Sequence, residues 1–185
     1  MANIATREAY GAALAELGEK YKDVVVLDAD LSKSTKTNDF KKKYPDRFFN
    51  IGISEQDLMG TAAGLATCGK IPFASTFAMF ATGRAFEQIR NSIAYPKLNV
   101  KIAATHAGIT LGEDGASHQA IEDVAVMRAV PNMTIINPAD ALSTRKAIEA
   151  AILHNGPMYI RLGRLGVPEV YKNDMDFKIG KGIVL

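Results

Sequence analysis

Glu55 is the first residue in this sequence whose surroundings could give it a chemical role, because it precedes an uncharged segment at residues 58–68. One interpretation is a first-turn acid favoured by the helix dipole, within a Ser54-x-x-Asp57 capping pattern. The other is a carboxyl with a raised pKa in an apolar interface, where it could share a proton with a ligand. The segment has no charged face, so it predicts a helix buried all round, in part against a second subunit.

A second group of polar side chains lies in the glycine-bearing loop of residues 105–119, which contains His106, Asp114 and His118. The spacing of these three residues matches no metal-binding signature. A Ser117–His118 nucleophile would lack the G-x-S-x-G elbow, and the glycines do not form a dinucleotide fingerprint. A substrate-binding loop and an ordinary capped loop both remain open on spacing alone.

Aromatic and cationic residues complete the candidates. Phe77 and Phe80 straddle a predicted strand-to-helix turn, where an aromatic ring could stack on a ligand ring. Arg7, Arg161 and Arg164 are candidates for holding an anion, because a guanidinium offers several N–H donors and a fixed charge.

The elements that must position these residues alternate along the chain. Apolar runs predict strands at residues 24–27, 48–51, 71–77, 99–105, 133–137 and 158–162. Periodic segments predict helices at residues 6–21, 54–68, 82–95, 120–129 and 141–154, with a short lysine-rich helix before residue 45. This order predicts an α/β domain with a doubly wound, mainly parallel sheet and helices on both faces. Ligands bind at the carboxyl ends of the strands in such sheets, so the loops there are expected to form the site.

Length and composition set the limits. The 185 residues suffice for one sizeable core, which we expect over residues 1–172, with residues 173–185 beginning a linker or strand towards a further C-terminal domain. A net charge of +2 disfavours a nucleic-acid binder, and no apolar run approaches the ~20 residues of a membrane span. With no secretory signal visible, a cytoplasmic protein is expected. The single cysteine, Cys68, excludes an internal disulfide and is expected to be a small buried hydrophobe.

Three separated runs resemble one known family. They are residues 47–56 (Arg-Phe-Phe-Asn-Ile-Gly-Ile-Ser-Glu-Gln), 112–122 (Gly-Glu-Asp-Gly-Ala-Ser-His-Gln-Ala-Ile-Glu) and 127–133 (Met-Arg-Ala-Val-Pro-Asn-Met). In this order they resemble transketolase, and more narrowly its pyrimidine-binding domain in the form where the enzyme is made as two polypeptides. The resemblance extends from about Ile4 to Tyr171.

The resemblance implies that thiamine diphosphate binds between this domain and a diphosphate-binding domain of a partner chain. Glu55 would then hydrogen-bond N1′ of the aminopyrimidine, and His118 and His106 would be the other catalytic residues, with His118 facing the reacting centre. On the cofactor, Phe77 would stack on the pyrimidine, Phe80 would line its pocket, and Asp30 would lie close to the thiazolium. On the substrate, Asp114 would bind a donor hydroxyl. The substrate phosphate would be bound by Arg7, Ser34, His106 and Arg164.

The implied reaction moves a two-carbon ketol unit from a ketose phosphate such as xylulose 5-phosphate to an aldose phosphate such as ribose 5-phosphate, in the pentose phosphate pathway. The Gly-Asp-Gly and Asn-Asn motifs that hold diphosphate and Mg²⁺ in this family are absent from the sequence. The resemblance therefore implies that Mg²⁺ is held by the partner, an N-terminal transketolase chain, in a homodimer or heterotetramer. Ala107-Gly108 replaces a frequent Asp-Ser, and Ala74 replaces a usual aromatic, so we expect an altered pocket.

Alternatives remain within and outside the superfamily. A fragment of 1-deoxyxylulose-5-phosphate synthase and a β-like subunit of the 2-oxoacid dehydrogenase E1 component share parts of these motifs. A non-catalytic assembly module could retain the fold without the chemistry. Such a module would have no need of Glu55, His106, Asp114, His118 and Arg164 together.

Overall fold

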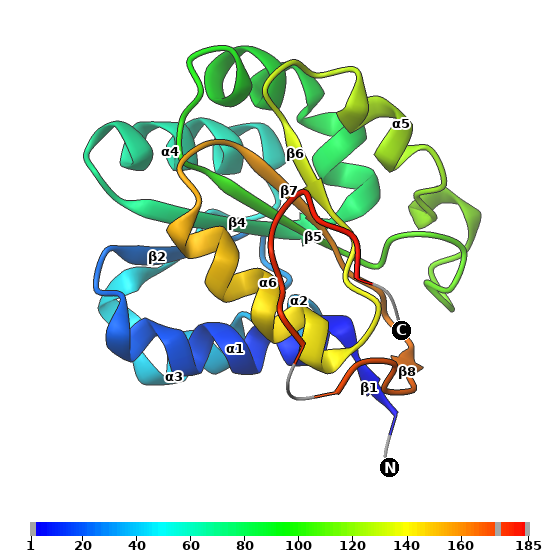
Figure 1. Cartoon of the computed structure of the whole chain (residues 1–185). Helices are drawn as coiled ribbons and strands as arrows, with labels where there is room; N and C mark the ends of the chain where they lie inside the picture. Colours follow the sequence, from blue (N-terminus) through cyan, green and yellow to red (C-terminus); the bar gives the residue numbers. More distant parts are fainter. Residues whose placement is uncertain (1–2, 173–174, 184–185) are drawn as a thin grey trace.

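A six-stranded, wholly parallel sheet forms the centre of the chain (Figure 1). The computed structural model describes residues 3–172 and 175–183. The strand order is β3-β2-β4-β5-β7-β6. The strands are β2 (Val24–Asp28), β3 (Phe48–Asn50), β4 (Ile71–Phe77), β5 (Lys101–Thr105), β6 (Thr134–Ile136) and β7 (Met158–Arg161). A separate antiparallel pair joins β1 (Ile4–Ala5) to β8 (Gly166–Val167). The predicted doubly wound α/β fold is confirmed.

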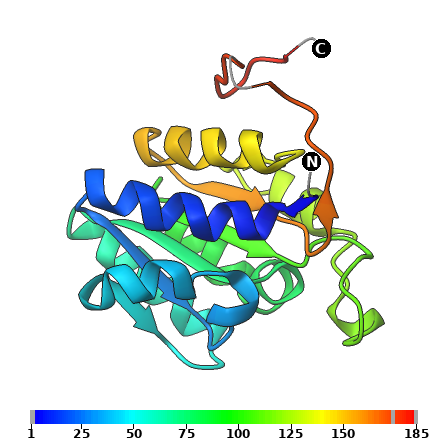
Figure 2. The same ribbon diagram turned by 90° about the horizontal axis from the view of Figure 1, so that it is seen from below.

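Helices cover both faces of this sheet (Figures 1 and 2). One face carries α1 (Thr6–Lys20), α3 (Asn38–Lys43) and α6 (Ala141–Leu153). The other carries α4 (Glu55–Thr67), α5 (Asp123–Arg128) and two π-helical stretches, η2 (Phe80–Arg84) and η3 (Gln88–Ala94). The short helix α2 (Ser32–Thr35) and the 3₁₀ turns η1 (Pro45–Arg47) and η4 (Ala116–His118) lie in connections.

Alternation along each strand divides the core in two. In β2, Val25 and Leu27 pack under α4, whereas Val24 and Val26 pack under α1. Successive side chains of a strand point to opposite faces, so an uninterrupted apolar strand needs a helical layer on each side. Both faces are therefore covered, and polar groups are left to the ends of the strands.

Details of this helix differ from or go beyond the prediction. Within the single chain one face of the uncharged segment, with Leu58 and Met59, is buried, whereas Gly60 and Gly64 are exposed; its burial against a second subunit stays a prediction. Cys68 is exposed rather than buried. Glu55 and Asp57 lie in the first turn of α4, as the first-turn interpretation of Glu55 expects, but the Ser54 side chain makes no capping hydrogen bond.

Other boundaries differ as well. The helix predicted over residues 82–95 contains the two π-helical stretches, and the helix predicted from residue 120 begins at Asp123. Of the linker or strand predicted over residues 173–185, residues 175–183 contain no strand, and residues 173–174 and 184–185 lie outside the described residues. The further C-terminal domain stays a prediction. Among the described residues, no helix has the length and apolar character needed to cross a membrane.

Asp140 fastens α6 to the segment that follows β8. It caps the N-terminus of α6: its Oδ1 accepts from the Ser143 backbone N–H at 2.7 Å. Its Oδ2 accepts from the N–H groups of Val170 (2.8 Å) and Tyr171 (2.9 Å). Burial alone would raise the pKa of Asp140, but the hydrogen bonds from Ser143, Tyr171 and Val170 lower it below its usual value.

We expect Asp140→Asn to lower the free energy of unfolding by about 1–3 kcal/mol at pH 7, because one amide oxygen cannot serve donors on both sides. The lowered carboxyl pKa stabilises the fold above the unfolded value of about 3.9 and this contribution is lost as the pH falls. The variant should therefore lose stability mainly at neutral pH. Urea unfolding at pH 7 and pH 3 measures this, with the exposed Asp46→Asn as control. Equal stability of Asp140→Asn and wild type at pH 7 would contradict it.

Candidate functional site

The carboxyl ends of four strands bring the candidate residues to one edge of the sheet. Asp30 follows β2, Phe77 ends β4, His106 follows β5, and Arg164 follows β7. The parallel register aligns Phe77 with the last residue of β5, Thr105, and so places Phe77 beside His106. This is the edge at which open α/β sheets bind their ligands.

Glu55 opens α4 with a buried carboxylate, 1% exposed. Its Oε2 accepts from an Nη of Arg84 at 2.7 Å, and its Oε1 accepts from the Thr76 hydroxyl at 3.3 Å. Thr76 comes from β4 and Arg84 from the π-helical stretch η2, so three elements converge on one carboxylate. A charged group this deeply buried requires such partners.

Four aromatic rings pack around this edge. The rings of Phe77 and Phe80 are nearly parallel, 14° apart, with centroids separated by 6.0 Å. The His106 ring lies 4.0 Å from Phe77, and the His118 ring meets Phe80 edge-on at 5.0 Å. The structure thus brings together Phe77, Phe80 and both loop histidines, which could stack on or enclose a flat ring.

His106 is held as a neutral imidazole. Its Nε2 lies 3.3 Å from an Nη of Arg7 and its Nδ1 lies 2.9 Å from the Thr105 hydroxyl. Because a guanidinium only donates, Nε2 is the acceptor and the proton is assigned to Nδ1. Burial lowers the pKa of His106 to about 4; the positive charges of Arg7 and Arg164 act in the same direction, whereas Asp114 opposes them.

His106 also has an unusual backbone. Its φ is +58°, a left-handed conformation that costs energy in a residue other than glycine. Asp30, on the loop after β2, has φ +61°. Conformations of this kind persist where the surrounding structure fixes them, and they concentrate at functional sites.

Arg7 connects His106 to the loop after β2. The same Nη donates to the backbone carbonyl of Ser34 at 2.7 Å. That loop is ordered by Asp28, which is fully buried and accepts hydrogen bonds from the Thr35 hydroxyl (2.6 Å) and the Thr37 hydroxyl (2.8 Å). Burial raises the pKa of Asp28, and these hydrogen bonds oppose the rise. The predicted anion-binding residues Arg7, Ser34 and His106 therefore meet.

Asp30 is oriented by an amide. Asn50, at the end of β3, donates from Nδ2 to the Asp30 carboxylate at 2.8 Å and accepts from the Asp30 backbone N–H at 3.0 Å. Asp30 is exposed and lines a hollow of about 380 Å³ with Ser34 and the residues between them. Its contacts are thus with Asn50 and its own loop.

Arg164 and Asp114 complete the site. A Cβ added to Gly112 would meet the Arg164 guanidinium at 2.7 Å, so the glycine, with φ +102°, lets the loop lie against that arginine. Asp114 is exposed and reaches His106 through its charge only. The third arginine candidate, Arg161, is instead engaged by buried Asp123, its Nε donating at 2.8 Å.

Sequence reasoning missed three residues that organise the site: Arg84, Asn50 and Asp28. Asn50 and Asp28 end adjacent strands, a position that could have marked them. Arg84 gave no signal, because its contact with Glu55 spans 29 residues and depends on the π-helical geometry of η2. Among the described residues, no three His, Cys, Asp or Glu side chains gather into a group that could hold a metal ion.

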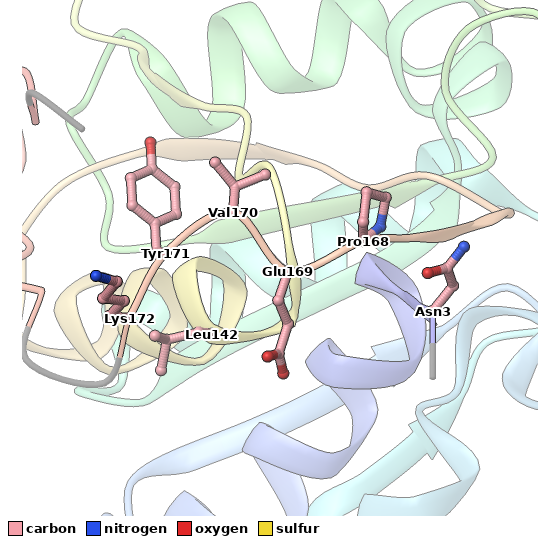
Figure 3. A pocket seen from close by; sticks show the side chains of 7 residues that line it. All are labelled: Asn3, Leu142, Pro168, Glu169, Val170, Tyr171 and Lys172. Atoms are coloured by element: carbon pink, nitrogen blue, oxygen red, sulfur yellow. The ribbon is translucent and has the colours of Figure 1, made fainter. Parts of the chain in front are cut away.

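A larger hollow lies away from this edge. It measures about 620 Å³ and none of the predicted site residues lines it (Figure 3). Its walls come from the start of the chain, α6 and the segment after β8: Asn3, Leu142, Pro168, Glu169, Val170, Tyr171 and Lys172. The polar and aromatic groups at the carboxyl edge make that edge the candidate site.

Comparison with known proteins assigns the family. The family model described as the transketolase pyrimidine-binding domain matches residues 2–169. This chain belongs to that family. A Methanocaldococcus jannaschii protein named as a transketolase C-terminal section is 58% identical over 97% of this chain and 57% of its own length. Human transketolase is 43% identical over 98% of this chain and 29% of its own length. The resemblance to transketolase is confirmed.

Solved structures agree with this assignment. One described as a split-gene transketolase, inactive beta4 tetramer, superimposes with a TM-score of 0.88 at 67% identity, covering 97% of this chain and 58% of the other. Transketolase from Leishmania mexicana gives a TM-score of 0.82 at 32% identity, covering 90% of this chain and 26% of the other. The chain therefore spans a part, about 30–60%, of the transketolases it matches.

The neutral state of His106 can be measured. We expect its ring to titrate near pH 4, and Arg7→Gln to raise that pKa by removing an adjacent positive charge. The unfolded chain protonates this ring near pH 6.5, so acidification from pH 6.5 to 4 should favour unfolding. Ring-proton NMR titration, assigned with His106→Asn, reports the pKa. The exposed Lys33→Gln is the control. Titration of wild-type His106 near pH 6.5 would contradict the expectation.

Proposed function

We propose that this chain is the part of a split, thiamine-diphosphate-dependent transketolase that receives the aminopyrimidine of the cofactor. Together with a partner chain carrying the diphosphate-binding domain, it would transfer a two-carbon ketol unit from a ketose phosphate to an aldose phosphate. The observation that carries the proposal is the buried Glu55 carboxylate, which is linked through Arg84 to the paired rings of Phe77 and Phe80, in a chain of the transketolase pyrimidine-binding family.

The residues present fit an aminopyrimidine. Such a ring is flat and carries an amino group, and its N1′ can share a proton with a carboxyl group, which matches Glu55 and the nearby aromatic faces. Glu55 would hold a proton at N1′, and Phe77 would stack on the ring with Phe80 lining the pocket. When bound, thiamine diphosphate supplies the carbon nucleophile that carries the two-carbon unit.

The other site residues would bind substrate. Arg7, His106 and Arg164 form a cationic and hydrogen-bonding group suited to a phosphate, and Arg7 already fixes the Ser34 loop beside them. His118, against Phe80, would face the reacting centre. The finer roles of Asp30 beside the thiazolium and of Asp114 on a donor hydroxyl belong to the same proposal.

The proposal extends to assembly. The sequence contains no Gly-Asp-Gly and no Asn-Asn pair, so Mg²⁺ and the diphosphate would be held by the N-terminal partner chain, in a homodimer or heterotetramer. The relatives include the protein named as a transketolase C-terminal section and one of the subunits of an apulose-4-phosphate transketolase from Phocaeicola vulgatus, the latter 40% identical to this chain. A cytoplasmic location and a place in the pentose phosphate pathway are parts of the proposal.

In the test, this chain is mixed with its partner chain, the product of the neighbouring gene, in the presence of thiamine diphosphate and Mg²⁺. The assay follows ketol transfer from xylulose 5-phosphate to ribose 5-phosphate. We expect activity only with both chains, and a loss of about 10²–10⁴-fold with Glu55→Gln, because proton transfer at the aminopyrimidine would be lost. Asp57→Asn, an exposed first-turn acid of the same helix, is the matched control and should retain activity.

Three results would redirect the proposal. Turnover by this chain without any partner would overturn the half-site assignment. Condensation of pyruvate with glyceraldehyde 3-phosphate in place of ketol transfer would indicate a deoxyxylulose-phosphate synthase. An active Glu55→Gln complex would remove Glu55 from the chemistry.

A further inference from the structure

The partner of Glu55 differs sharply from it in exposure. The Glu55 side chain is 1% exposed, whereas the Arg84 side chain is 49% exposed. The Thr76 hydroxyl donates to Oε1 from strand β4, and the Arg84 guanidinium donates to Oε2 from the more exposed side. Of the groups around the carboxylate, the Arg84 guanidinium is therefore the one that can move into water without unpacking the core.

Arg84 contacts the aromatic cluster as well as Glu55. Its guanidinium carbon lies 4.7 Å from the centroid of the Phe80 ring. Both residues belong to the π-helical stretch η2, in which the Ala85 N–H reaches back five residues to the Phe80 carbonyl at 3.2 Å. π-Helical turns are rare and occur frequently at functional sites.

The Arg84 guanidinium resembles chemically the aminopyrimidine ring that is expected to bind the Glu55 carboxylate. It is planar, cationic and delocalised, it donates N–H groups to a carboxylate, and it stacks on aromatic faces. An aminopyrimidine protonated at N1′ has these same properties. Both groups therefore satisfy the same two features of the chain, the Glu55 carboxylate and the aromatic rings.

Resting on the function proposed above, we propose that Arg84 occupies the aminopyrimidine position on Glu55 in the cofactor-free chain, and that cofactor binding displaces it. Among the described residues, the buried carboxylate would keep only the Thr76 hydroxyl as a hydrogen-bond partner without Arg84, and a hydroxyl is a poor partner for a full charge. Arg84 thus stabilises the chain before assembly and competes with the cofactor afterwards. It is a positioning residue that opposes binding of the ring.

The test measures cofactor affinity rather than turnover. Thiamine diphosphate with Mg²⁺ is titrated calorimetrically into the complex of this chain with its partner, for wild type, Arg84→Ala and Arg90→Ala. Arg90 is an exposed arginine of η3 that bonds Asn91, and it serves as the matched control. We expect Arg84→Ala to tighten the Kd about tenfold, equivalent to ~1.4 kcal/mol, and Arg90→Ala to leave it unchanged.

A second measurement uses the full chain alone. Arg84→Ala should lower its melting temperature, because the Glu55 carboxylate loses its charged partner. In a Glu55→Gln background the same change should have little effect, since no charge is left to pair, and this difference would show that the two residues act as a pair. If Arg84→Ala does not fold, Arg84→Gln, which removes the charge and keeps an N–H donor, should tighten the Kd in the same direction.

The outcomes separate this inference from the proposed function. An unchanged or weaker Kd for the Arg84 variants, with normal binding by wild type, overturns the competition while leaving the transketolase assignment intact. Absence of cofactor binding by the wild-type complex overturns both. A tighter Kd of the Arg84→Ala complex for thiamine diphosphate, together with a less stable free chain, supports displacement of Arg84 from Glu55 by the cofactor. An arginine with a purely structural role would not weaken cofactor binding.

Discussion

Burial of the parallel sheet on both faces is the constraint on which the rest of this molecule depends. Because β2, β4 and β5 are covered by helices above and below, a polar side chain within them would need a buried partner. Chemistry is consequently confined to the strand ends. The parallel pairing of β2 with β4, β4 with β5 and β5 with β7 brings the carboxyl ends of these strands, and the residues that follow them, to one edge.

The alternation of apolar strands and amphipathic helices was sufficient to predict this architecture and the edge that carries the site. It could not predict pairs that depend on side-chain geometry. The contact of Arg84 with Glu55 requires a π-helical turn, and the clamp of Asn50 on Asp30 requires the β2–β3 register. The uncharged part of α4 limited the prediction in another way, because glycines and alanines are compatible with exposure in a single chain as well as with burial between chains.

The site residues have unequal support from their surroundings. Glu55, His106 and Asp28 are buried and each makes at least two hydrogen bonds, so their positions follow from the packing of the domain itself. Asp30, Asp114 and much of Arg84 face solvent. The inner part of the site is thus built by this chain alone, whereas the outer part is open to contact with another molecule.

The left-handed backbone of His106 has a consequence for how such a domain could change over time. A non-glycine residue in this conformation carries a strain of about 1–3 kcal/mol that glycine would not carry. Glycine there would also remove the imidazole that joins Phe77 to Arg7. Selection for an unstrained backbone would therefore favour replacing this residue, whereas selection for the contacts of the imidazole would oppose the replacement. Retention of histidine at this position in a thermostable relative would mean that the contacts had prevailed.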